Sequence, residues 1–324
     1  MTQIPLPEWA PHQAVWIGFP SAADLWLEDL APAQSEVAAF AAAVHSDGAG
    51  EEVWLVAADE AAAAQARRLA PFAKVIVEPF GDIWLRDTGA IVSGGGDARR
   101  AQGFGFNGWG GKYDLPGDDS IGERLARLAG LPYRKSDWIL EGGAVDGDGS
   151  GTFLTTEQCL LNPNRNPGFD KEEVEQRLAR DLGASRVIWL GDGLLNDHTD
   201  GHVDNLARFV APNRVAIPEA VADDPNAGAY ADAAELLLDA DLEVVAIPSP
   251  GEVIRDAEIV PASYMNFYIG NAAVVVPLYG SANDGAAVDA IQELFSERMV
   301  VGLRADHLLT GGGSFHCISQ QVPA

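Results

Sequence analysis

The sequence predicts an α/β fold built from similar units. Short apolar strands alternate with helices about every 40 to 60 residues along the chain. Glycine-rich turns separate these elements, and no linker rich in proline or serine divides them. Polar, reactive residue types stand at the strand ends or in the loops that follow. These observations favour one domain, residues 1–324, whose loops gather around a single site.

The elements of the first third follow this pattern in order. After a lead-in loop, residues 14–19 and 52–57 are short apolar runs that predict strands. Alanine-rich residues 31–44 have helical spacing. Asp59 is expected to cap a second helix that ends at Leu69, because its carboxylate accepts from free N–H groups. Residues 74–78 predict another strand.

The same criteria give the later elements. Helices are expected at residues 120–129, 171–182, 230–239 and 286–295. Strands are expected at residues 138–140, 151–156, 187–190, 214–217, 244–247, 273–276 and 299–303. Residues 160–169 contain two prolines and a glycine and are expected to form a loop.

Composition narrows the class of protein. The chain has 324 residues, of which 47% are hydrophobic, so it can bury a full core. No apolar run is long enough to span a membrane, and the N-terminus lacks a secretory signal pattern. Two cysteines cannot form a disulfide framework. We therefore expect a soluble, cytoplasmic protein.

The charge of the chain limits its partners. A net charge of −27 argues against a nucleic-acid partner, which would require a basic patch. It is compatible with a cationic substrate, since a negative field draws cations toward clefts. Solubility in a salty cytoplasm explains the same charge.

Cys317 lies in a glycine-hinged segment near the C-terminus. Three glycines, residues 311–313, precede it and allow close approach to a bound group. Phe315 and Ile318 are apolar and are expected to anchor the segment in the core. Cys317 is therefore a candidate nucleophile, although a buried free cysteine explains the local sequence equally well. Cys159, among apolar residues, is expected to be a core thiol.

Residues 82–87 combine acidic, basic and aromatic side chains. In a strand, Trp84 would share a face with Asp82 and Arg86, and Asp87 would stand at the end. A carboxylate beside a large aromatic can pair with a planar cation and stack against it. The alternative is an internal salt bridge from Arg86 to an aspartate with Trp84 in the core, and we expect Arg86 to be structural.

Two further clusters carry titratable groups. Glu141 follows an apolar strand and precedes two glycines, which would place it at a cleft or at the cap of a turn. His202 and Asp204 would share one face of a strand, where the imidazole can act as general acid and base. Together with His198 they have a spacing that permits a metal site. Neither H-E-x-x-H nor a zinc-type Cys/His spacing occurs in the sequence, so no metal or other cofactor is expected.

The combination of these groups favours a planar cationic substrate. A papain-type site needs a thiol, an imidazole and an amide or carboxylate, but not several extra carboxylates. Two carboxylates can each accept paired N–H groups from a guanidinium and hold its carbon in front of a sulfur. The glycines of residues 103–108 resemble a dinucleotide-binding fingerprint, but aromatic residues interrupt them and no helix is expected to follow.

Eight stretches, in order along nearly the whole chain, match a known family. They are WAPHQAVWIGFP (9–20), DIWLRDTG (82–89), FNGWGGKYD (106–114), EGG (141–143), LTTEQCLLNPNRNP (154–167), TDGHVDN (199–205), SYMNFYIGN (263–271) and GGGSFHCISQQ (311–321). In these motifs the chain resembles the agmatine deiminases, of the family that also contains the bacterial, Porphyromonas-type peptidylarginine deiminases. The resemblance implies a pseudo-fivefold α/β propeller of ββαβ-type units around a central active site.

The resemblance also implies an activity: hydrolysis of agmatine to N-carbamoylputrescine and ammonia through a covalent thiouronium, on the route to putrescine. By the same resemblance Cys317 is the nucleophile, His202 the general acid and base, and Asp87 and Asp204 hold the guanidinium. Trp84 would pack along the substrate, and Glu141 would line the pocket. Relatives are commonly dimers or larger, which favours a homodimer.

Two positions depart from the family pattern. Ser314 and Phe315 stand where Asn-Ile is expected before the His-Cys pair, and His198 stands where relatives often carry an acidic residue. His198 is therefore a candidate for recognition of the distal amine of the substrate. Two alternatives stay open: a deiminase for another guanidine, such as free or peptide-terminal arginine, and a non-catalytic guanidine-binding protein.

Overall fold

A computed structural model describes residues 3–255 and 257–324, so the first two residues of the expected lead-in loop lie outside the described part. The strands are β1 (His12–Phe19), β2 (Glu52–Ala57), β3 (Lys74–Val77), β4 (Ile91–Ser93), β5 (Arg100–Gly105), β6 (Tyr133–Ile139), β7 (Asp146–Gly147), β8 (Thr152–Thr155), β9 (Arg186–Trp189), β10 (Arg208–Ala211), β11 (Arg214–Glu219), β12 (Glu243–Pro248), β13 (Ile254–Arg255), β14 (Glu258–Ile259), β15 (Tyr268–Ile269), β16 (Ala273–Leu278), β17 (Met299–Arg304) and β18 (Ser319–Pro323).

The α-helices are α1 (Ala23–Trp26), α2 (Leu30–His45), α3 (Glu60–Leu69), α4 (Leu85–Thr88), α5 (Gly108–Gly111), α6 (Asp118–Leu128), α7 (Glu157–Leu160), α8 (Lys171–Leu182), α9 (Ala227–Asp239), α10 (Asp284–Leu294) and α11 (Asp306–Thr310). The 3-10 helices are η1 (Leu27–Asp29), η2 (Ser46–Gly48), η3 (Gly96–Ala98), η4 (Gly142–Ala144), η5 (Val203–Asn205) and η6 (Tyr264–Asn266).

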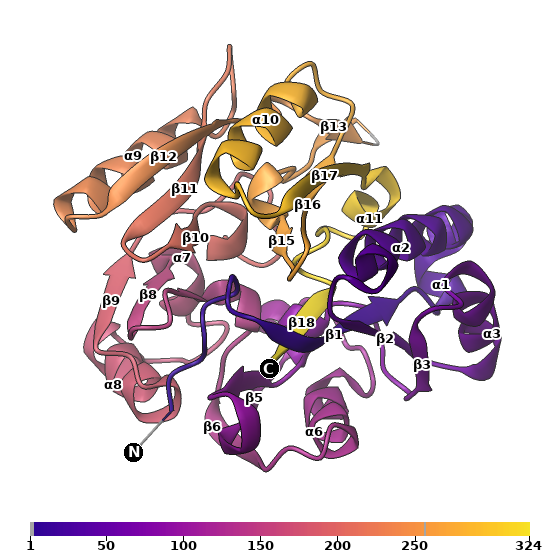
Figure 1. The fold of residues 1–324 in the computed structure, drawn as a ribbon. Helices are drawn as coiled ribbons and strands as arrows, with labels where there is room; N and C mark the ends of the chain where they lie inside the picture. Colours follow the sequence, from indigo (N-terminus) through magenta and orange to yellow (C-terminus); the bar gives the residue numbers. More distant parts are fainter. Residues whose placement is uncertain (1–2, 256) are drawn as a thin grey trace.

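One arrangement of strands and helix recurs along the chain. Over the described residues the strands form five sheets of three or four strands and one two-stranded hairpin. Each larger sheet contains an antiparallel pair next to a parallel pair, for example β4–β5 and β5–β6. A helix connects the parallel strands in each case, as a parallel pair requires, and these helices lie at the periphery in Figure 1. The predicted mixed α/β fold of similar units is confirmed.

The two ends of the chain meet in one sheet. Strand β18 pairs antiparallel with β1, and β1 pairs parallel with β2. In Figure 1 the yellow β18 lies directly beside the indigo β1. Helix α2 covers this region, and its Phe40 ring stacks on Phe315 with centroids 4.8 Å apart. Phe315 and Ile318 are fully buried, so the expected apolar anchor of the Cys317 segment is confirmed.

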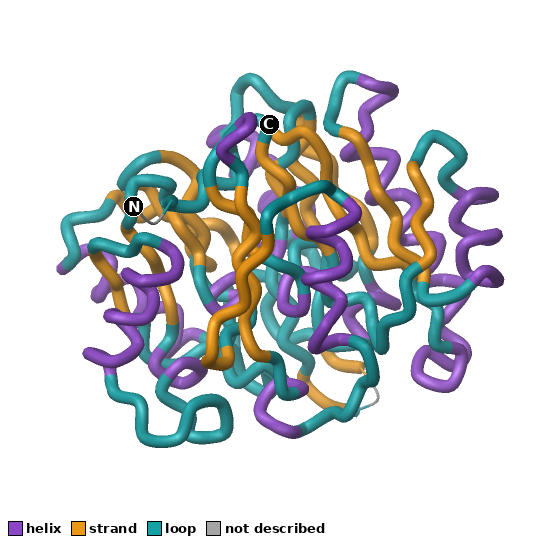
Figure 2. Tube along the Cα trace, turned by 90° about the horizontal axis from the view of Figure 1, so that it is seen from below, coloured by secondary structure: helices purple, strands orange, loops and turns teal. Residues whose placement is uncertain are grey.

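The connections between sheets position the candidate site. Helix α4, η4, η5, η6 and the turn before β18 all occur where the chain leaves one sheet for the next. Figure 2, turned by 90° from Figure 1, shows loops extending from the strand ends while helices flank the strands. These connections carry Asp87, Gly143, Asp204 and Cys317.

Several local predictions match closely. The helix predicted at residues 171–182 is observed as α8 with the same limits. Asp59 caps α3, since its Oδ1 accepts from the Ala62 amide at 2.8 Å. Among the residues that the structure describes, no helix is both long and apolar enough to cross a bilayer.

Two predictions of extended backbone are wrong. Residues 85–88 form α4, and residues 203–205 form η5. Local bonds replace a sheet partner in α4: the Asp87 and Thr88 amides both donate to the Trp84 carbonyl at 3.1 Å. A strand here would need a neighbour to satisfy its backbone groups, whereas a turn satisfies them locally. Strands β5 and β10 and the short helices α5 and α7 were not predicted.

Candidate active site

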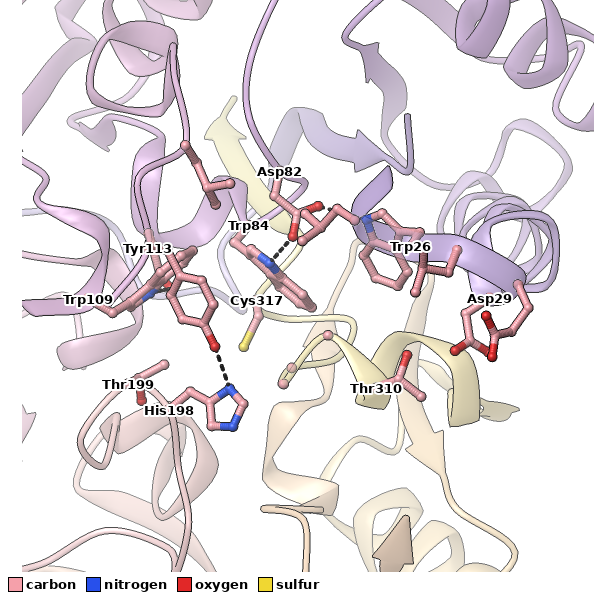
Figure 3. Close-up of a pocket in the computed structure, with 18 residues that line it drawn as sticks. Trp26, Asp29, Asp82, Trp84, Trp109, Tyr113, His198, Thr199, Thr310 and Cys317 are labelled. Atoms are coloured by element: carbon pink, nitrogen blue, oxygen red, sulfur yellow. Dashed lines mark hydrogen bonds between the residues drawn. The ribbon is translucent and has the colours of Figure 1, made fainter. Parts of the chain in front are cut away.

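A cavity of about 310 Å³ opens beside Cys317. Figure 3 shows the sulfur directed into this pocket, near Trp84, Trp109, Tyr113 and His198. The lining residues are Leu25–Asp29, Asp82, Trp84, Asp87, Trp109, Tyr113, Leu115, His198, Thr199, Thr310–Gly313 and Cys317. They come from five separate stretches of sequence, which the connections between sheets bring together.

Glycines allow the Cys317 segment to approach the aromatic wall. A Cβ atom on Gly313 would lie 2.6 Å from the Trp84 ring and 3.0 Å from the Cys317 Cβ. The backbone at Gly313 thus passes so close to the Trp84 ring that a side chain would not fit, and close approach to a bound group stays a prediction. Asn266 holds the turn, because its Oδ1 accepts from the amides of His316 and Cys317 at 3.1 and 3.2 Å. Its Nδ2 lies 3.0 Å from the Cys317 sulfur.

The predicted reactive groups converge beside Gly143. A Cβ atom on this glycine would lie 2.6 Å from His202 Nδ1, 2.8 Å from Asp87 Oδ1 and 3.1 Å from Asp204 Oδ2. The Cys317 sulfur is 3.6 Å from the same oxygen of Asp204. Four side chains separated by up to 230 positions in sequence therefore meet in one small volume.

Asp87 is held by two donors. Its Oδ1 accepts from the Gly143 amide at 3.0 Å, and its Oδ2 accepts from the Trp109 indole at 2.9 Å. Burial raises the pKa of Asp87 above its ordinary value; His202 opposes this rise and Asp204 adds to it. The carboxylate is thus fixed in direction at the edge of the cavity.

Asp204 lies deeper and is fully buried. Burial raises its pKa, but the hydrogen bond and positive charge of His316 outweigh burial and hold the pKa below its usual range. Its Oδ1 has no hydrogen-bond partner among the described residues. A buried carboxylate oxygen without a donor is costly, and an N–H of a bound cation would satisfy it.

His202 is also fully buried, with Nδ1 3.6 Å from Asp87 Oδ1. Burial lowers its pKa, but the charge of Asp87 and the contacts with Cys159 and Glu141 outweigh burial and raise the pKa well above the ordinary value. The raised pKa favours the protonated ring, which is the form that can act as an acid, and neither ring nitrogen has a hydrogen-bond partner among the described residues.

The surroundings of the Cys317 thiol favour its uncharged, protonated form. Burial, followed by the charges of Asp204 and Asp87, raises its pKa well above that of a free cysteine. Burial is the larger cause, and the two carboxylates add to it. The thiol is thus protonated at neutral pH before a cation enters.

Two tryptophans and one aspartate form the wall opposite His198. The indoles of Trp26 and Trp84 donate to the two oxygens of Asp82, at 2.9 and 2.7 Å, as Figure 3 shows. Burial raises the pKa of Asp82 to about 6, against the effect of these bonds. Across the cavity, Tyr113 Oη lies 3.1 Å from His198 Nδ1. A flat or extended cation fits between such aromatic faces.

The structure corrects the expected placement of Glu141. Its side chain is fully buried behind His202 rather than among the residues that line the cavity. Its Oε1 accepts from Arg165 Nε at 2.9 Å. Cys159, buried as expected, joins Glu141 and His202 in a group whose ligand atoms lie within 4.8 Å of one another. A divalent cation can use such donors, but Arg165 already balances the carboxylate.

Arg86 is structural, as expected, but its partner is different. Its guanidinium pairs with Glu8 at 3.2 Å instead of with an aspartate of its own segment. Glu8 also accepts from the ring of His316, which is buried next to Cys317. Sequence reasoning did not identify Glu8, Trp26, Asn266 or His316 as parts of the site. For Glu8 and Asn266 the sequence contains a signal, because each is a polar residue within an otherwise apolar or aromatic stretch, at residues 8–12 and 263–269.

Comparisons with known proteins agree over the full length. A sequence profile described as Porphyromonas-type peptidyl-arginine deiminase matches residues 5–323. The agmatine deiminase of Stutzerimonas stutzeri is 38% identical over 98% of this chain and 94% of its own length.

Solved structures give the same result. The agmatine deiminase of Enterococcus faecalis superposes with a TM-score of 0.93 at 32% identity, covering 99% of this chain and 96% of the other. A cysteine-to-serine variant of the C. jejuni agmatine deiminase with substrate bound has a TM-score of 0.89 at 26% identity, covering 100% and 97%.

Proposed function

The chain belongs to the Porphyromonas-type peptidyl-arginine deiminase family, and on that premise we propose that it hydrolyses agmatine to N-carbamoylputrescine and ammonia. One observation carries the proposal. Cys317 and Asp87 line an aromatic-walled cavity, and the fully buried His202 imidazole and Asp204 carboxylate lie in contact with them behind its wall. The enzyme is a hydrolase acting on a C–N bond of a linear amidine, and it would act before putrescine formation.

The two aspartates hold the guanidinium in this proposal. A guanidinium carbon is a poor electrophile, because its positive charge is delocalised over three nitrogens. Carboxylates that accept from its N–H groups localise the charge and orient the carbon toward the sulfur. The unpartnered Asp204 Oδ1 and the fixed Asp87 carboxylate are the acceptors. Trp84 packs along the substrate.

The first half of the reaction forms a covalent intermediate. The bound cation lowers the pKa of the Cys317 thiol, which releases its proton to solvent, and the resulting thiolate adds to the guanidinium carbon. The tetrahedral adduct collapses as the C–N bond to one terminal nitrogen breaks. The His202 imidazolium gives its proton to that nitrogen, which leaves as ammonia. An S-alkylthiouronium remains on Cys317.

The second half regenerates the enzyme. Neutral His202 removes a proton from water, and the hydroxide adds to the same carbon. The C–S bond then breaks as the hydroxyl proton of the adduct passes to the departing sulfur, so a neutral ureido group is released and the Cys317 thiol is restored. Glu141 acts behind His202, where its pairing with Arg165 holds a carboxylate beside the ring without placing it in the cavity.

Further features of the protein are proposed on the same basis. The five sheets would be the units of a pseudo-fivefold propeller, within one domain that spans residues 1–324. The substrate would be a small cationic guanidine, with neither nucleic acid nor membrane as partner. We expect a cytoplasmic homodimer that needs no metal. His198, on the cavity wall, would contact the distal amine.

The decisive experiment is ammonia release from agmatine. We expect turnover by the wild type and a loss of at least about 1,000-fold in Cys317→Ala, since no other thiol lies at the cavity. Cys159→Ser, which keeps a side chain of similar size with a hydrogen-bonding group beside His202, is the matched control and is expected to release ammonia. Binding of agmatine without ammonia release by the wild type would instead indicate a guanidine-binding protein.

Substrate choice is tested with three guanidines side by side. Agmatine, free arginine and a peptide that ends in arginine differ at the end remote from the guanidinium. We expect the highest kcat/KM for agmatine, because two named relatives are agmatine deiminases and the cavity is of small-molecule size. Equal kcat/KM values for all three guanidines would contradict agmatine as the preferred substrate.

A further inference from the structure

A buried network of alternating charges runs from Asp204 away from the cavity. Its members are Asp204, His316, Glu8, Arg86, Arg208 and Asp146. They come from the N-terminal lead-in, α4, β7, the region before and in β10, and the turn before β18. The family resemblance gave a role only to Asp204. None of the other members lines the cavity beside Cys317, and Glu8, Arg86, Asp146 and His316 line a separate, smaller cavity. An effect of these residues on the reaction would therefore pass through Asp204.

His316 is the link between the network and the site. Its Nδ1 lies 2.7 Å from Asp204 Oδ2, and its Nε2 lies 2.9 Å from Glu8 Oε2. Ionised carboxylate oxygens accept hydrogen bonds and do not donate them. With both carboxyl groups ionised, the form that the lowered pKa of Glu8 and of Asp204 favours, a proton on each ring nitrogen of His316 satisfies both contacts.

Charge balance supports the same protonation state. Glu8 pairs with Arg208 at 3.1 Å and with Arg86 at 3.2 Å, while Asp146 pairs with Arg208 at 3.4 Å. Three carboxylates then face two guanidiniums and one imidazolium, and the buried network is neutral. A neutral His316 would leave one unbalanced negative charge in the interior, which is costly.

We propose that His316 is a positioning residue: a buried imidazolium that keeps Asp204 ionised and turns its second oxygen toward the substrate guanidinium. This inference rests on the proposed function. Because Asp204 Oδ2 is engaged by His316, Oδ1 alone is left to receive an N–H. Glu8 holds the ring from the other side, so that the imidazole cannot turn away. The positive charge of the His316 ring also offsets the repulsion between the carboxylates of Asp204 and Asp87.

Other titratable groups surround this contact. On the cavity side Asp204 faces His202, Asp87 and Cys317. On the far side Glu8 faces the phenol of Tyr268. All of these groups stay in place when only His316 is changed, so a shift in a pH profile is assigned to that residue.

The test compares His316→Gln with the wild type. Glutamine keeps one N–H donor but has no charge, so Asp204 loses its cation. We expect KM for agmatine to rise about tenfold or more with a smaller change in kcat, and the acid limb of kcat/KM to move upward by about one pH unit. The matched control is His45→Gln, at the end of α2 against Phe72, which is expected to change neither quantity.

A purely structural role gives a different result. In that case His316→Gln lowers thermal stability and activity while the acid limb stays where it is, and the proposal fails. A second measurement needs no variant to fold: ¹⁵N-histidine NMR of the wild type. Both ring nitrogens of His316 are expected to be protonated at pH 8, and a neutral tautomer would overturn the proposal. If the wild type turns over no agmatine, the proposed function fails while the NMR result still decides this inference.

Discussion

Gly143 has no room for a side chain. The nearest atoms to a Cβ built there belong to three of the four proposed catalytic residues, His202, Asp87 and Asp204. Its amide also donates to Asp87, so the backbone itself is part of the site. One glycine thus sets how closely an imidazole and two carboxylates can approach, and that spacing decides whether they hold a flat cation.

Gly143→Ala is therefore expected to lower kcat/KM for agmatine by about 100-fold or more, because the methyl group must push apart groups that need sub-ångström placement. Steady-state ammonia release measures this. Gly285→Ala, in α10 with open space at its Cβ position, is the matched control and is expected to keep wild-type activity. A fully active Gly143→Ala enzyme would show that the three side chains do not act together.

Alkylation of Cys317 by iodoacetamide is expected to be slow at neutral pH in the free enzyme. Burial and two carboxylates raise the thiol pKa well above its ordinary value, so the thiolate fraction, and with it the rate, should rise with pH and not level off by pH 9. Mass spectrometry of the modified peptide reports the rate, with Cys317→Ala as control. A rate that is already constant at pH 7 would mean that the thiol is ionised without substrate.

At the scale of elements, the connections between sheets matter more than the sheets. Helix α4 carries Trp84 at its N-cap and Asp87 within it, while η4 and η5 carry Gly143 and Asp204. η6 carries Asn266, and the last turn carries Cys317. Each connection follows a repeated strand–helix–strand unit. Because the unit is repeated, each unit contributes one connecting segment with a residue of the candidate site.

This arrangement explains what the sequence could predict. Apolar periodicity is a local property, so α8, α3 with its cap and most parallel strands were predicted within a few residues. Alternation of polar and apolar residues at 82–87 and 202–204 indicated strands, but those backbones form short helical turns. The residues were identified correctly as a group even though the geometry assumed for them was wrong.

The other features of the candidate site depend on contacts between residues far apart in the sequence, which no local pattern contains. Trp26 and Trp84 share Asp82 across 56 residues, and His316 reaches Glu8 across 308. The burial of Glu141 behind His202 follows from its pairing with Arg165, which lies in a loop 24 residues later. Such pairings are set by the packing of whole units, so a single sequence gives only the list of candidates.

Asp59→Ala tests an element that is remote from the cavity. Loss of the capping bond to the Ala62 amide should lower the free energy of unfolding by about 1 kcal/mol, because one N–H at the start of α3 loses its acceptor. Urea denaturation measures this, and agmatine turnover is expected to stay unchanged. Asp59→Asn keeps an oxygen acceptor and should retain most of the stability; equal losses in both variants would contradict the capping role.

At the scale of the molecule, the net charge of −27 creates a field that attracts cations. We expect kcat/KM for agmatine to fall several-fold between 20 mM and 500 mM salt, because salt screens this attraction. Arginine, whose carboxylate leaves a lower net charge, should show a smaller decline in the same series. Identical salt dependence for the two guanidines would mean that the surface charge serves solubility alone.

The pairing of β1 with β18 has a consequence for biosynthesis. At a translation rate of roughly 5–20 residues per second, about 15 to 60 seconds pass between the synthesis of these two strands. Until the last strand leaves the ribosome, the edge of β1 that later binds β18 is open to other chains. The nucleophile emerges with that last strand, so the nascent polypeptide cannot be active before its first sheet is closed.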